Sequence, residues 1–115
     1  MATEYFTDKQ VFAFAQPIWD SICEGSNNVD YDKFSRYFSD SLKEMVTKDV
    51  FEYQCDVSSL LTTLGKATPV ACIRREDGYS VIFKQTSTQF PGEFVGLLTL
   101  SDIGEDAFVE NVQVI

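Results

Sequence analysis

The sequence of 115 residues contains no histidine. This absence excludes the Ser-His and Cys-His pairs that activate nucleophiles, and it removes the imidazole ligands of most zinc sites. Carboxylates alone could hold a metal, but the acidic residues are scattered. The densest group is Asp102, Glu105 and Asp106, and it lacks the ligand order of a calcium loop. We therefore expect a solvated turn there, and neither a metal nor a cofactor.

Cysteine is also scarce. The three cysteines, Cys23, Cys55 and Cys72, lie far apart and form no Cys-x-x-Cys pair. An odd number at long spacing argues against a disulfide framework and indicates reduced thiols. The first ten residues show no basic segment followed by an apolar run, so no signal peptide is expected. Together these features predict a cytoplasmic protein.

Basic residues are scarce and long apolar runs are absent as well. The formal net charge is −9, and a surface this negative repels phosphate backbones and anionic lipid headgroups. No apolar run approaches the roughly 20 residues of a membrane span. The sequence therefore predicts no nucleic-acid partner and no membrane partner. With 44% hydrophobic residues and ten Phe, the chain is expected to fold as one domain, residues 1–115.

The first part of the chain has helical periodicity. Three residues, Thr7, Asp30 and Thr47, stand where N-caps would begin helices. The first helix is expected to end near Gly25 and to kink before Pro17. The second is short and ends near Asp40. The third is expected to be long, 48–64, with a core face of Val50, Val57, Leu61 and Leu64, broadened by Phe51 and Leu60.

The last fifty residues predict four β-strands, at 70–75, 79–87, 94–101 and 107–115. Asp77-Gly78 indicates a two-residue hairpin turn that would pair Arg74 with Val81 and Cys72 with Phe83. Phe90-Pro91-Gly92-Glu93 indicates a type II turn, and 102–106 would form the last turn. Helices followed by a meander predict an α+β fold: three N-terminal helices packed on a curved four-stranded antiparallel sheet.

The third predicted strand is apolar on both faces. Phe94, Leu98 and Leu100 would point one way, and Val95 and Leu97 the other. A sheet covered on one side only should alternate apolar with polar residues. We therefore expect the helices, chiefly 48–64, to cover one face and a second copy of the chain to cover the other, which gives a homodimer through the sheet.

The order of elements resembles the nuclear transport factor 2-like superfamily. The similarity spans nearly the whole chain, and is carried by Phe38 to Thr47, by Leu64-Gly65-Lys66, and by the strand segments 78–84 and 92–96. The resemblance implies a cone-shaped cystatin-like fold with a pocket at its open end. In enzymes of this group the pocket holds an Asp with a Tyr or with a His; the lack of histidine excludes the second pair.

Five residues are candidates for lining such a pocket: Trp19, Tyr53, Cys72, Tyr79 and Phe83. Each is also explained as a core residue on an apolar stripe. The first functional hypothesis is a non-enzymatic domain that dimerises through its sheet and binds a small apolar molecule in the cone. The alternative is an isomerase- or dehydratase-like enzyme that uses a pocket carboxylate of raised pKa and a Tyr.

Overall fold

The computed structural model describes residues 5–101 and 108–115. In this part of the chain the helices come before the strands. Four α-helices and one 3₁₀-helix come first: α1 (Asp8–Asn27), α2 (Tyr31–Phe34), α3 (Asp40–Met45), α4 (Lys48–Val57) and η1 (Ser59–Thr62). The expectation of three helices therefore missed α3, and the chain is α+β as predicted.

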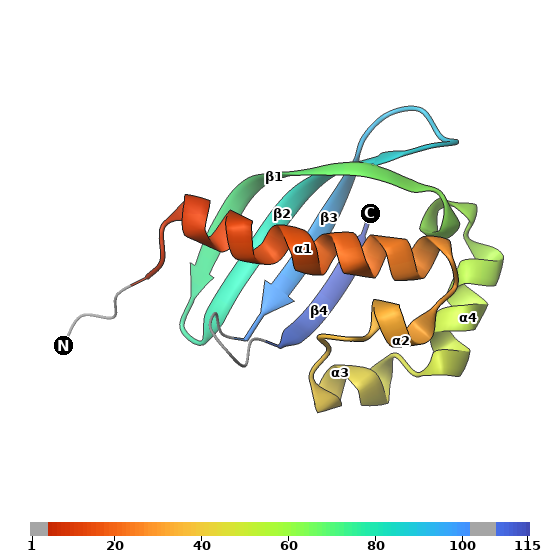
Figure 1. Cartoon of the computed structure of the whole chain (residues 1–115), viewed down its shortest axis with the longest axis horizontal. Coiled ribbons are helices and arrows are strands. Elements are labelled where there is room, and N and C mark those ends of the chain that lie inside the picture. The colour runs from red at the N-terminus through yellow and green to blue at the C-terminus, as the bar shows by residue number, and fades with distance from the viewer. Residues whose placement is uncertain (1–4, 102–107) are drawn as a thin grey trace.

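Four strands follow and form one antiparallel meander: β1 (Leu64–Arg75), β2 (Gly78–Ser87), β3 (Phe94–Leu100) and β4 (Val109–Val114), in the order β1-β2-β3-β4. Helix α1 lies across one face of this sheet, and α2, α3 and α4 gather beyond its β4 end (Figure 1). The last predicted turn, 102–106, and the start of the fourth predicted strand at Ala107 lie outside the described residues.

Helix α1 begins at a capping box. The backbone N–H of Gln10 donates to Thr7 Oγ1, and the side chain of Gln10 accepts from the backbone N–H of Thr7. The helix runs on through Pro17 to Asn27. Its buried face includes Trp19, which is completely inaccessible. The helix that covers the inner face of the sheet is therefore α1.

The prediction that a long helix at 48–64 covers the sheet is wrong. Helix α4 ends at Val57, and Val50 and Val57 of the predicted core face are exposed, whereas Phe51 is buried. Tertiary contacts also place Leu64, the end of the predicted helix, in a strand. The Asn27 side chain makes two 2.8 Å hydrogen bonds to the backbone N–H and C=O of Leu64, and these bonds fix an extended conformation at a position where sequence periodicity predicts the end of a helix.

Strand β1 therefore starts six residues earlier than predicted and includes Pro69, with register shifts on both sides of it. Proline is tolerated here because β1 is an edge strand. The predicted hairpin pairing is also wrong: Arg74 pairs with Tyr79 and Cys72 with Val81, so the two-residue turn is Glu76-Asp77. Gly92 has φ of +92°, as the third position of the predicted type II turn requires.

The two faces of the sheet differ in their cover. Leu98 and Leu100 are fully buried on the α1 side. On the outer face Ile73 and Val95 are 47% and 43% exposed, and Leu97 is half-buried. Apolar side chains thus stand on both faces of β3, as the sequence indicates. Within residues 5–101 and 108–115, no helix has the length and apolar character needed to cross a membrane.

Candidate functional site

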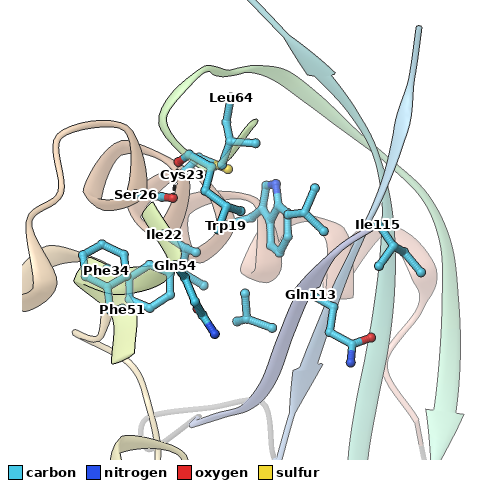
Figure 2. Close-up of a pocket in the computed structure, with 13 residues that line it drawn as sticks. Trp19, Ile22, Cys23, Ser26, Phe34, Phe51, Gln54, Leu64, Gln113 and Ile115 are labelled. Carbon is cyan, nitrogen blue, oxygen red and sulfur yellow. Dashed lines mark hydrogen bonds between the residues drawn. The ribbon is translucent and has the colours of Figure 1, made fainter. Parts of the chain in front are cut away.

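A cavity of about 280 Å³ lies between the C-terminal half of α1, the first turns of α4, and β4 (Figure 2). Its size is just below the roughly 300–1,000 Å³ typical of ligand sites. Thirteen residues line it: Trp19, Ile22, Cys23, Ser26, Phe34, Phe51, Gln54, Leu61, Leu64, Val112, Gln113, Val114 and Ile115. Most of these side chains are apolar.

Trp19 forms one wall, and three contacts fix its position. Its ring stacks on Phe83 with centroids 4.9 Å apart and planes 10° apart. Its edge lies over Gly96, where an added Cβ would come within 2.4 Å of the indole ring. Its Nε1–H donates to Gln85 Oε1 at 2.8 Å. The indole is thus held on its face, its edge and its polar atom, which makes it a rigid wall.

Gln85 is the polar centre beneath this wall, and it is completely buried. Besides the Trp19 bond, Oε1 accepts from the thiol of Cys23 at 3.5 Å. Its Nε2 donates to the carbonyls of Gly65 and Thr86 at 2.9 and 2.8 Å. Both ends of the amide are therefore satisfied, and a buried amide in this state is stabilising rather than reactive.

Cys23 lies beside Gln85 and also lines the cavity. Burial, reinforced by the negative charge of Asp20, raises the pKa of the thiol to about 12. At neutral pH the group is a neutral thiol with little nucleophilic character. Cys23 therefore contributes a small apolar surface and a weak donor rather than a reactive centre.

The opposite wall is aromatic. Phe34 and Phe51 stack with ring centroids 4.2 Å apart, and Ser26 donates from its hydroxyl to the carbonyl of Leu61. Gln54 and Ile115 line the cavity and are exposed, so the cavity opens between α4 and the C-terminal end of β4.

None of the described lining side chains carries a formal charge, and none belongs to a Tyr. Charged molecules find no counter-ion in such a site, so the lining favours an uncharged occupant. Nor do residues 5–101 and 108–115 hold any group of three or more Cys, Asp or Glu close enough together to bind a metal ion. The carboxylate-Tyr pair that the enzyme alternative requires has no members among these lining residues.

The structure distributes the five pocket candidates over different regions. Trp19 lines the cavity, and Phe83 lies directly behind it. Tyr79 is buried at the other end of β2, where its hydroxyl accepts from the Phe6 N–H at 2.9 Å. Cys72 is half-buried on β1, and Tyr53 is 67% exposed on α4.

Sequence reasoning missed the β4 side of the site and Gln85. The strand pattern places Val112 and Val114 on one face, but nothing local indicates that α4 stands opposite them. Gln85 lies in a strand of alternating character and looks like an ordinary exposed polar residue. Its burial follows from its position under Trp19, 66 residues away.

Comparison of the chain with protein-family models, with curated proteins and with solved structures found no match. Interpretation of the site therefore depends on its own geometry.

Proposed function

We propose that this protein is a non-enzymatic binding module whose cavity takes a small, uncharged apolar group. The observation that carries the proposal is the lining: Trp19, Phe34 and Phe51 form rigid aromatic walls, and no charged side chain lines the described part of the site. An aromatic cavity with a few satisfied polar groups is typical of ligand sites. An isomerase or dehydratase would need a carboxylate at the cavity.

The fold that we propose for this module is the cone of the nuclear transport factor 2-like superfamily. Two features support it. A long N-terminal helix, α1, lies across one face of a four-stranded meander (Figure 1). A cavity opens at one end of their interface. In the proposal α1 takes the place of the long helix around which the sheet curves.

The module is further proposed to dimerise through the outer face of its sheet. Ile73 and Val95 are 47% and 43% exposed on β1 and β3, and Ile82 and Leu97 pair between them. Exposed apolar side chains on one face of a sheet are candidates for an interface. A second copy covers it with the same residues, as a two-fold axis requires.

Titration with small fragments tests the binding proposal. Benzyl alcohol and hexanol are the neutral probes, and benzoate and hexanoate are their charged counterparts. Trp19, the only tryptophan, reports binding through its emission. We expect saturable changes with the neutral pair and changes at least about tenfold weaker with the carboxylates, which must shed their hydration in an uncharged site.

The variant Ile22→Phe, which adds volume inside the cavity, is expected to abolish the neutral response. Tyr53→Phe, on the exposed side of α4, is the matched control and should leave it intact. The proposal is overturned if the carboxylates bind as well as the alcohols, or if Ile22→Phe folds and changes nothing.

A further inference from the structure

The hydrogen bonds of β4 show which of its backbone groups face away from the sheet. Val95 and Ile115 exchange both of their hydrogen bonds, at 2.7 and 2.8 Å. In an antiparallel ladder such pairs alternate with pairs whose N–H and C=O groups point outward. Ile115 and Gln113 therefore bond toward β3, whereas Val112 and Val114 direct their N–H and C=O groups away from it. No backbone group of the described residues outside the sheet bonds to these outward groups.

The same edge already pairs with an extended segment of the chain further along. The N–H of Val109 donates to the carbonyl of Tyr37 at 2.7 Å, and the carbonyl of Val109 accepts from the N–H of Ser39 at 2.9 Å. This gives a parallel bridge between Phe38 and Val109. The chain thus covers the start of the β4 edge with its own extended segment, and it leaves Val112 to Val114 without such a cover.

The exposed part of the edge adjoins the cavity. Four consecutive residues, 112–115, line it. Since side chains alternate between the two faces of a strand, a cavity on one face alone would not touch all four. Figure 2 shows Gln113 and Ile115 on the opposite side of the β4 ribbon from Phe34 and Phe51. The cavity therefore extends to the backbone edge of β4, and α4 forms its other side.

We infer that this site takes an extended peptide, which adds as a strand to β4 at Val112–Val114 and places one apolar side chain in the cavity. The edge supplies main-chain hydrogen bonds and the cavity supplies side-chain selectivity, as in other β-strand additions. The inference rests on the proposed function, because it assigns the apolar group of that proposal to a peptide.

Charge selects the flanks of the peptide. On β4 itself the charged residue is Glu110, which is exposed and accepts a hydrogen bond from the Ser39 hydroxyl at 3.0 Å. The whole chain has a net charge of −9. A peptide with Lys or Arg on either side of its apolar residue complements this negative charge and is steered toward the chain, at a rate that falls as the salt concentration rises.

A random nonapeptide library displayed on phage tests this inference against the full chain. We expect enriched sequences with a central aromatic or aliphatic residue and basic flanks. Each enriched peptide is then made in two N-methylated forms, which block alternate sets of backbone amides. Only the set that faces β4 forms the ladder, so one form should bind about tenfold more weakly or worse, and the other about as well as the parent.

A pair of variants examines the protein side. Val114→Pro removes an outward N–H without removing a bond to β3, and this variant is expected to lose most of the peptide affinity. Val114→Thr keeps the N–H and a similar side-chain shape, and this control should retain the affinity. Amide exchange at Val112 and Val114 should slow when peptide is added, whereas Gln113, which bonds to β3, should change little.

Equal binding by the two N-methylated forms would overturn strand addition and leave the apolar cavity in place. The absence of any enriched peptide would also overturn it, and the fragment titration would still decide the binding proposal independently. If the Val112 and Val114 amides become protected with rising protein concentration and no peptide, the edge pairs with a second copy and the inference is wrong.

Discussion

The indole N–H of Trp19 and the side-chain carbonyl of Gln85 form a 2.8 Å hydrogen bond in which both residues are completely inaccessible to solvent. This bond joins α1 to β2 behind the wall of the cavity. A buried bond of this kind leaves an expensive unsatisfied donor when its acceptor is removed.

Replacement of Gln85 by Leu should therefore lower the free energy of unfolding by about 2–3 kcal/mol, since the Trp19 N–H and the Gly65 carbonyl both lose a partner. Urea unfolding followed by circular dichroism measures the change. Gln89→Leu is the matched control, because Gln89 is exposed and the same substitution there should cost little. Equal effects of the two variants would contradict the role assigned to Gln85.

Gly96 should not tolerate a side chain. A Cβ at this position would stand 2.4 Å from the Trp19 ring, so Gly96→Ala must displace the indole at a cost of about 1–3 kcal/mol. The emission of Trp19 should shift as the ring moves. Trp19→Phe removes the clashing ring atoms. In that background Gly96→Ala should lower the free energy of unfolding clearly less than it does in the parent chain. If the effects of the two substitutions on the free energy of unfolding simply add, the contact with Trp19 is not the reason that Gly96→Ala is destabilising.

The Cys23 thiol should be unreactive in the folded protein. With the pKa of Cys23 raised to about 12 by burial and then by Asp20, only about a thousandth of this group is thiolate at pH 9. Iodoacetamide at pH 9 should modify Cys23 far more slowly than the half-buried Cys72. Mass spectrometry of the peptides gives both rates, and comparable rates would show that the thiol is accessible.

The same shift predicts a loss of stability at alkaline pH. The folded state keeps Cys23 neutral, whereas the unfolded chain ionises it above its ordinary pKa of 9.0. The contribution of the Cys23 thiol to the free energy of unfolding is therefore fully present below pH 9, and it is lost as the pH rises from 9 toward 12. The urea midpoint of the parent should fall more steeply across this range than that of Cys23→Ala. Parallel curves for the two proteins would contradict the burial argument.

The outer sheet face should control oligomeric state. Val95→Lys places a charge beside Lys84 on that face, and this repulsion and desolvation should convert a dimer to a 13.0 kDa monomer. Sedimentation velocity at micromolar concentration measures the mass. Val57→Lys, at a 62% exposed position on α4, should remain dimeric. A parent chain that sediments as a monomer would rule out the proposed dimer.

Local signals in the sequence determined much of the fold. The caps at Thr7, Asp30 and Thr47 begin helices as predicted, because a side-chain oxygen bonds a backbone N–H three residues ahead and depends on nothing distant. The two-sided apolar pattern of β3 was likewise readable, since strand alternation is a property of the backbone.

Only the tertiary structure decided where β1 begins, which helix covers the sheet, and how the first hairpin is aligned. Leu64 becomes the start of a strand because Asn27 bonds it from another helix. Gln85 becomes a core residue because Trp19 lies over it. Both depend on partners at least 37 residues away, and local periodicity carries no information about such distant contacts. The cavity arises in the same way, where α1, α4 and β4 meet.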